Sequence, residues 1–122
     1  MVLRANAGRL LVHQISSDIA VRAALAARTF RGPGAYERGD QMVRAALSVP
    51  SNIAEACGRG TVAEFRRFLI YARGSAHELR SQLQLARRMD PDQAAQYRSM
   101  ESQTTLVIKL LGRLYDQPPP DR

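Results

Sequence analysis

Regularly spaced arginines are the residues of this chain best suited to bind a charged ligand. Five of them repeat every seven positions, and two more lie next to members of that series: Arg59, Arg66, Arg73, Arg80 and Arg87, with Arg67 and Arg88. Arginine suits phosphate because its planar guanidinium donates two hydrogen bonds and is weakly hydrated. A seven-residue spacing keeps side chains on one stripe of a helix. The pattern therefore predicts an electrostatic track for RNA or DNA.

Two other interpretations of these arginines stay open. They could form a solvated flank of a helix, or they could pair between helices or subunits with Glu55, Glu64, Glu78 and Glu101. The chain has three phenylalanines, four tyrosines and no tryptophan, which argues against a platform for stacking bases. The sequence alone does not decide between a nucleic-acid track and these pairings.

Polar residues also occur within the apolar seams of two expected helices. Asn52 and Glu55 are three positions apart, as are Ser75 and Glu78, so each pair lies on one helical face. Polar groups inside a bundle need hydrogen-bond partners. We expect a network between helices that sets their register, and an active site is the alternative interpretation.

Residue patterns that support metal binding or catalysis do not occur. A dimetal carboxylate bundle requires histidine three positions after a glutamate, and no glutamate of the chain has one. His13 and His77 are far apart, and Cys57 is the only cysteine, so neither zinc nor a cysteine nucleophile is indicated. We therefore expect a protein that is not an enzyme, with no catalytic residues, no cofactor and no metal.

Turn signals divide the chain into four long amphipathic pieces. Glycine and proline at 31–34, 58–60 and 90–91 separate them. Apolar residues repeat at steps of three and four within each piece, starting with Leu11 in the first. This spacing predicts helices over about 6–30, 36–57, 61–89 and 91–115. Short connections predict an all-α, antiparallel up-down-up-down four-helix bundle in one domain, 1–115, followed by a disordered proline-rich tail, 116–122.

Local signals predict further details of these helices. Thr61 and Glu64 form a capping box, and Asp90 with Gln93 forms a variant of one. Pro50 lies inside the second helix, where we expect a kink and not an end.

Gly74 and the apolar residues off the main seams lead to two predictions about packing. Gly74 lies in the middle of the third helix, where glycine costs about 1 kcal/mol relative to alanine. We expect it to allow close approach of a neighbouring backbone, so that Gly74→Leu disrupts the bundle. Ile70, Val43 and Leu47 lie off the main seams, which indicates a second buried face and hence an oligomer.

Composition limits the class of protein. The 122 residues carry 18 basic and 11 acidic side chains, a net charge of +7, and Lys109 is the only lysine. Residues 58–89 hold seven arginines against Glu64 and Glu78, a net +5. An apolar fraction of 45% suffices for a core, and the length suits one domain. One cysteine, no signal peptide and no apolar run of roughly 20 residues indicate a cytoplasmic protein without a membrane partner.

Two stretches of the chain resemble a known family. Ser48 to Glu55 reads Ser-Val-Pro-Ser-Asn-Ile-Ala-Glu and is followed by Gly58 and Arg59. The second stretch contains Glu64-Phe65, Phe68-Leu69, Ala72-Arg73-Gly74-Ser75, Glu78-Leu79 and Gln82-Leu83. Together they resemble the bacterial four helix bundle protein family, whose founding members are encoded in intervening sequences of large-subunit ribosomal RNA genes. The structural positions of the two motifs are Pro50, Asn52, Glu55, Gly74, Ser75 and Glu78.

The chain departs from the family pattern at two places. Ala56 and Cys57 follow Glu55, where the family has glycine and then usually an aromatic residue. The tryptophan common in the family's first helix is replaced near Val12 and His13. Both changes concern packing.

The resemblance implies an up-down four-helix bundle that assembles into rings of five and has no established catalytic activity. A more distant branch, the accessory proteins of diversity-generating retroelements, consists of basic pentamers that work with a reverse transcriptase and nucleic acid. By that analogy we expect a non-enzymatic homopentamer that acts as a scaffold, with RNA or DNA as candidate partner. The alternative is a protein–protein interaction module whose arginines serve subunit or partner contacts.

Overall fold

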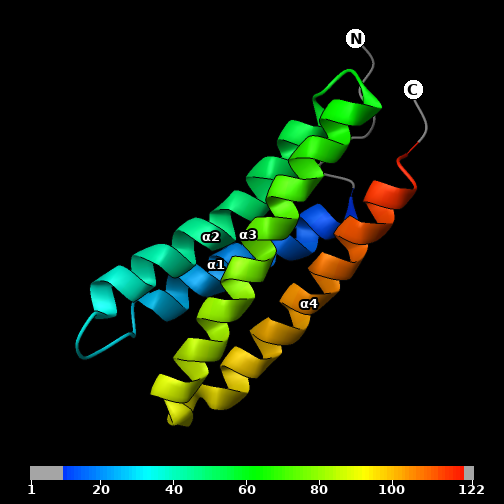
Figure 1. Cartoon of the computed structure of the whole chain (residues 1–122). Coiled ribbons are helices and arrows are strands. Elements are labelled where there is room, and N and C mark those ends of the chain that lie inside the picture. Colours follow the sequence, from blue (N-terminus) through cyan, green and yellow to red (C-terminus); the bar gives the residue numbers. More distant parts are fainter. Residues whose placement is uncertain (1–9, 120–122) are drawn as a thin grey trace.

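Four α-helices make up most of the protein. A computed structural model describes residues 10–119. The helices are α1 (Leu11–Ala27), α2 (Ala35–Cys57), α3 (Val62–Met89) and α4 (Ala94–Asp116), and a single 3-10 turn, η2 (Pro91–Gln93), precedes α4 (Figure 1). No strand occurs within residues 10–119, so the predicted all-α class is confirmed.

The helix bounds differ from the prediction mainly at the end of α1 and at the start of α4. The expected start at Asn6 lies outside the described residues. The helix ends at Ala27 and not at Phe30, because the Thr29 hydroxyl donates to the Ala26 carbonyl at 2.7 Å and the chain turns away. Gly32 completes this turn with a φ of +82°, a backbone conformation that favours glycine. At the other end of the chain, α4 includes Asp116, and residues 120–122 lie outside the described part.

The two predicted caps have different outcomes. The Thr61 hydroxyl accepts a hydrogen bond from the Glu64 amide at 3.1 Å, as a capping box requires. Neither Asp90 nor Gln93 makes a side-chain cap, so the predicted capping box of the last helix is wrong. The chain enters α4 through the 3-10 turn instead, in which the Gln93 amide donates to the Asp90 carbonyl at 3.1 Å. The helix α2 continues through Pro50, as expected.

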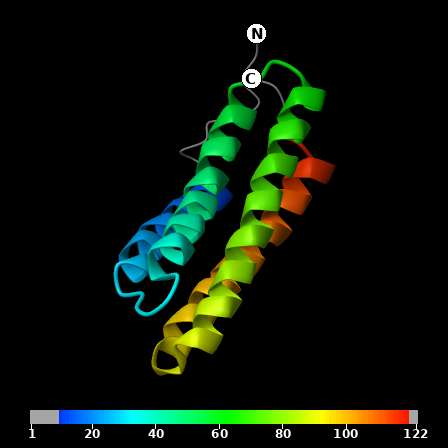
Figure 2. The same cartoon turned by 60° about the vertical axis from the view of Figure 1, so that its left-hand side comes forward.

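The helices α2 and α3 pack with opposite directions. Between α2 and α3, Gln41 meets Gln82 at 3.1 Å and Ser48 meets Ser75 at 2.8 Å, so rising numbers on one helix face falling numbers on the other. The helices α3 and α4 run side by side along most of their length (Figures 1 and 2). The short helix α1 contacts α2 more extensively than α4.

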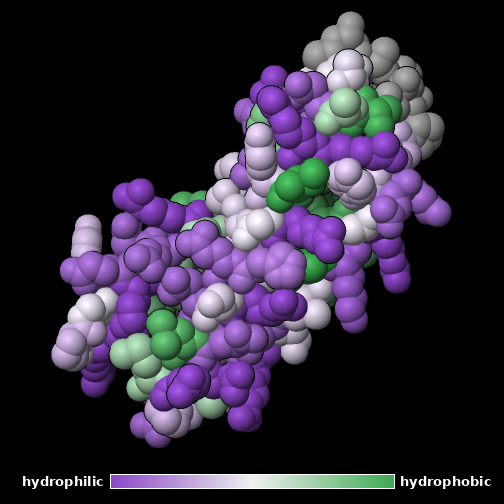
Figure 3. Space-filling model, viewed as in Figure 1, coloured by the Kyte–Doolittle hydropathy of each residue, from purple (hydrophilic) through white to green (hydrophobic). Residues whose placement is uncertain are grey.

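The core lies along the facing seams of all four helices. Its largest fully buried side chains include Ile19, Met42, Ile53, Phe65, Leu69, Leu83, Tyr97, Met100 and Leu111. Most of these residues belong to α2, α3 and α4, where apolar residues repeat at steps of three and four as the sequence predicts. The seam of α1 is shifted by one position at its start: Leu11 is 58% exposed, whereas Val12 is 3% exposed. On the face shown in Figure 3, hydrophilic residues cover most of the surface and hydrophobic residues form small separate patches.

Gly74 does not have the packing role that the sequence predicts. A Cβ added at Gly74 meets no atom within 4 Å, because this glycine lies on the exposed side of α3. The close-approach interpretation is therefore wrong for the backbone of this chain. The close approach occurs at Gly39 on α2, where an added Cβ would lie 3.3 Å from the Ala27 Cβ and 3.5 Å from the Ala27 carbonyl.

Candidate nucleic-acid interface

Six of the seven predicted arginines lie on α3 and three of these contact α4, whereas Arg59 lies in the connection before α3. Because the helix rises about 1.5 Å per residue, a seven-residue step separates neighbours by about 10 Å along the axis. Arg66 reaches the last turn of α4, whereas Arg87 reaches its second turn. The structure thus divides seven arginines that are equivalent in the sequence pattern into groups with different surroundings.

Arg66 caps the end of α4. Its Nε donates to the carbonyl oxygen of Tyr115 at 2.8 Å, and its guanidinium lies 5.3 Å from the centroid of the Tyr115 ring. The last carbonyls of a helix have no partner within the helix, and the partial negative charge there favours a cation. Arg66 therefore stabilises the packing of α3 against α4.

Arg87 forms an ion pair between the same two helices. Its Nε donates to one oxygen of Glu101 at 2.8 Å, and its Nη2 donates to the other at 3.3 Å. The Glu101 side chain is only 14% exposed, so water screens this pair weakly. One charge of the stripe is thereby largely neutralised.

Arg59 and Arg67 gather around one aromatic ring near the start of α3. Their guanidiniums lie 4.4 and 5.3 Å from the centroid of the Phe68 ring. Arg59 also pairs with Glu55 at 2.9 Å, and Arg67 pairs with Glu64 at 3.1 Å. Both ion pairs are substantially exposed, and such pairs contribute at most about 1 kcal/mol. These arginines have partners within the chain but remain reachable from solvent.

Arg73, Arg80 and Arg88 make no ion pair with an acidic residue in the described part of the chain. Nη1 of Arg80 lies 3.5 Å from the Thr105 hydroxyl, and Nη2 lies 3.2 Å from Nδ1 of His77. Burial, and then the charges of Arg80 and Arg73, lower the pKa of His77. His77 is therefore neutral near pH 7 and adds no charge beside the arginines.

An open depression of about 430 Å³ lies between α3 and α4. It is lined by Arg80, Gln84, Arg87, Arg98, Glu101, Ser102 and Thr105. Three guanidiniums and two hydroxyls from two helices thus surround one surface hollow. Guanidinium and hydroxyl donors are the groups that most often bind the phosphates of nucleic acids. Arg88 is exposed but does not line this depression.

The sequence pattern missed the contribution of α4. Arg98, Ser102, Thr105 and Lys109 follow each other at steps of four, three and four, so they lie on one face of the helix. Arg98 and Lys109 are exposed. This spacing was available as a signal, but only the packing shows that the face adjoins the α3 arginines. We define the α3–α4 basic face by Arg73, Arg80, Arg87, Arg98 and Lys109, with Ser102 and Thr105.

The remaining polar positions of the family motifs lie between α2 and α3 or on the surface. The Asn52 side-chain amide donates to the Ser48 carbonyl at 2.8 Å and to its hydroxyl at 2.9 Å, and this hydroxyl lies 2.8 Å from that of Ser75. Asn52, Ser48 and Ser75 form the polar link between the two helices. Glu55 and Glu78 are exposed and do not join it. Half-buried Pro50 lies within α2 close to this link.

Comparison with known proteins identifies the family. The family model for the 23S rRNA-intervening sequence protein matches residues 8–113. The chain belongs to this family. A crystal structure at 1.70 Å resolution is similar to it: a protein of unknown function from the S23 ribosomal protein family of Bacteroides thetaiotaomicron VPI-5482. The two chains are 26% identical, the match covers 88% of this chain and 100% of the other, and the TM-score is 0.77. No protein of curated function matches the chain.

The match confirms the family resemblance that the two motifs predict. Within residues 10–119 of this intervening sequence protein, no three side chains of His, Cys, Asp or Glu gather closely enough to hold a metal ion. None of its described helices combines the length and the apolar character needed to span a membrane.

Proposed function

We propose that this intervening sequence protein is a non-enzymatic, self-associating cytoplasmic scaffold that binds RNA or DNA through the α3–α4 basic face. The observation that carries the proposal is the depression in which Arg80, Arg87 and Arg98 converge with two hydroxyls. Single arginines are common on protein surfaces, whereas this hollow is lined by three guanidiniums from two helices. Glu101, which also lines it, pairs with Arg87, so Arg80 and Arg98 remain for an anion.

The donor types support binding to the sugar–phosphate backbone. Arginine and hydroxyl groups contact phosphate without reading bases. The distance from Arg73 to Arg87 along α3 is about 21 Å at about 1.5 Å per residue, which matches about six base pairs of duplex. We therefore expect binding to double-stranded RNA or DNA with little sequence preference and strong dependence on salt.

A charge-matched pair of variants tests this proposal. The first replaces Arg73, Arg80 and Arg98 by glutamine. The control variant replaces Arg28, Arg44 and Arg113 by glutamine. These three arginines are exposed and do not line the depression. Both variants lose the same charge, so a difference between them reports position and not net charge. Arg66 is left intact because it caps α4.

Fluorescence anisotropy with short RNA and DNA duplexes at several salt concentrations is the measurement. We expect the first variant to bind at least about tenfold more weakly than the wild type, and the affinity of the control to change less than about threefold. Each lost phosphate contact should also reduce the slope of log affinity against log salt concentration by about 0.9. Equal losses in both variants, or no binding of either duplex at low salt, contradict the proposal.

The oligomer is the second part of the proposal. The antiparallel pairings of α2 with α3 and of α3 with α4 support the up-down-up-down topology that the resemblance implies. Several large apolar side chains on different helices are about half exposed or more, among them Val21, Leu25, Leu47, Ile70 and Tyr71. Such residues are typical of interaction surfaces. We expect a homopentamer, and light scattering should give five times the mass of the chain, whereas a monomer contradicts this part.

A protein–protein interaction module remains the second candidate function. The same exposed apolar residues favour it, because aromatic and aliphatic side chains dominate the centres of protein interfaces. In that case the basic arginines would serve contacts with a subunit or a protein partner.

A further inference from the structure

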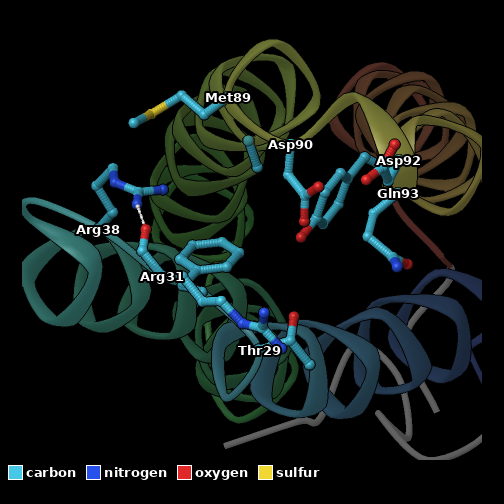
Figure 4. A pocket seen from close by; sticks show the side chains of 10 residues that line it. Thr29, Arg31, Arg38, Met89, Asp90, Asp92 and Gln93 are labelled. Atoms are coloured by element: carbon cyan, nitrogen blue, oxygen red, sulfur yellow. Dashed lines mark hydrogen bonds between the residues drawn. The ribbon is translucent and has the colours of Figure 1, made fainter.

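A second pocket lies where the loop between α1 and α2 meets the turn between α3 and α4 (Figure 4). Its volume of about 340 Å³ is within the range of small-molecule sites. It shares no lining residue with the depression of the α3–α4 basic face. The residues that matter for its chemistry are Phe30, Arg31, Arg38, Asp90, Asp92 and Tyr97.

Charges of both signs line this pocket without pairing. Arg31 and Arg38 come from the α1–α2 side, whereas Asp90 and Asp92 come from the turn before α4 (Figure 4). None of these four residues forms an ion pair with any residue in the described part of the chain. The four charges balance to zero, so the pocket does not favour a simple anion or a simple cation. A ligand that carries both signs would satisfy both walls.

Arg38 is held in place and has one donor without a partner. Its Nη2 donates to the Arg31 carbonyl at 3.0 Å, and its guanidinium lies 5.0 Å from the centroid of the Phe30 ring. Its Nε is buried and has no hydrogen-bond partner among the described residues. A carboxylate is the acceptor that a guanidinium binds best, because the two groups match in shape and charge.

The pocket also has an apolar wall. The Phe30 and Tyr97 rings meet edge to face, with centroids 6.4 Å apart, and Met89 lines the same space. Met89 is 51% exposed, so part of its apolar surface is uncovered. Burial and, more weakly, the negative charge of Asp90 raise the pKa of Tyr97. Its hydroxyl therefore stays protonated at neutral pH.

We infer that this pocket, which is lined by the Phe30 ring and by Arg38 and Asp90 without ion-pair partners, binds a zwitterionic α-amino acid with an apolar side chain. The carboxylate of the ligand contacts Arg38, and its ammonium contacts Asp90. Its side chain packs against Phe30 and Met89. A ligand that lacks either charge leaves one wall of the pocket desolvated without a partner, which is unfavourable. The inference is independent of nucleic-acid binding.

Isothermal titration of the wild-type protein with L-methionine, L-leucine and L-phenylalanine tests the inference. The N-acetyl derivative of each amino acid lacks the ammonium group and its methyl ester lacks the carboxylate, so the two are matched single-charge probes. We expect at least one of the three amino acids to bind, and we expect its single-charge analogues to bind at least about tenfold more weakly. No binding of the three at millimolar concentration, or equal binding of the analogues, overturns the inference.

Variants of the pocket locate the site. Asp90→Asn keeps the shape of the side chain and is expected to weaken binding at least about tenfold, as is Arg38→Gln. Because Arg38 also packs on Phe30, its variant could unfold, and the isosteric Asp90 variant then carries the test. Asp18→Asn, on the exposed side of α1 and outside the pocket, is the control and should leave binding unchanged. Unaltered binding by the Asp90 variant would place the ligand elsewhere and overturn the inference.

Discussion

Arg66 and Arg73 lie one heptad apart on α3 but have different surroundings. Arg66 donates to the Tyr115 carbonyl and packs on its ring, whereas Arg73 is exposed and makes no ion pair in the described chain. A guanidinium at the end of a helix stabilises the fold through a hydrogen bond and the helix dipole. A solvated guanidinium contributes charge to the surface and little stability.

Replacing each of these arginines by methionine should separate the two roles. We expect Arg66→Met to lower the free energy of unfolding by about 1–2 kcal/mol, because α4 loses its charged cap. We expect Arg73→Met to change it by less than about 0.5 kcal/mol. Urea unfolding followed by circular dichroism is the measurement, and equal effects of the two variants would refute the capping role.

Gly74 and Gly39 provide a second comparison between residues of one type. Both are helical, so alanine should gain up to about 1 kcal/mol from helix propensity at either position. Gly74 has open space around it, whereas an added Cβ at Gly39 lies 3.3 Å from Ala27. We expect Gly74→Ala to raise the free energy of unfolding by about 0.5–1 kcal/mol. The free energy of unfolding of the Gly39→Ala variant should be at least about 1 kcal/mol below that of the Gly74→Ala variant. Loss of stability in the Gly74 variant would show that its side of α3 is covered in solution.

Among the elements, α2 and α3 are joined by an apolar seam, a polar link and the hydrogen bond between Gln41 and Gln82. The link consists of Ser48, Asn52 and Ser75. Apolar seams tolerate small slips of one helix along another, because hydrophobic contact has little directionality. A directional hydrogen bond such as the one between the two serine hydroxyls is broken by such a slip. The polar link therefore sets the register of α2 against α3.

A double-mutant cycle tests this link. We expect Ser75→Ala and Ser48→Ala each to lower the free energy of unfolding by about 1 kcal/mol, with a coupling energy of at least about 0.5 kcal/mol between them. Ser81→Ala, on the exposed side of α3, is the control and should have little effect. Additive effects of the two single variants would show that the hydroxyls do not interact.

For the molecule as a whole, the positions of the arginines matter more for anion binding than the net charge of +7. Some of the arginines have protein partners, such as Glu101 for Arg87 and the Tyr115 carbonyl for Arg66. Others gather with Arg98 around an open depression. In the proposed homopentamer, each subunit repeats this basic face, so the assembled protein would carry several equivalent anion sites. Multiple sites bind one long nucleic acid more tightly than a single site does.

Assembly and nucleic-acid binding can be separated in one variant. We expect the glutamine variant of Arg73, Arg80 and Arg98 to keep the mass of the wild-type oligomer, because those residues lie on the α3–α4 basic face and bind nucleic acid in our proposal. Light scattering at equal protein concentration is the measurement. Dissociation of this variant would favour the alternative function, in which the arginines serve subunit contacts.

Local sequence patterns are enough to predict the four helices, most of the core and the family. Periodicity is a local property, so positions such as Met42, Phe65 and Leu83 are recognisable as core residues without a structure. The start of the α1 seam, Leu11 against Val12, was misassigned because two adjacent apolar residues fit the same period. The heptad of arginines was also visible in the sequence.

The surroundings of each arginine depend on the tertiary structure. Arg66 and Tyr115 lie 49 positions apart, and Arg87 and Glu101 come from different helices, so their contacts depend on how α3 and α4 dock. The same docking brings Arg98 beside Arg80 and places Asp90 opposite Arg38. Helix periodicity specifies the direction of a side chain around its own axis. The rotation and offset of one helix against the next follow from the packing of the whole core, and these decide which charges meet.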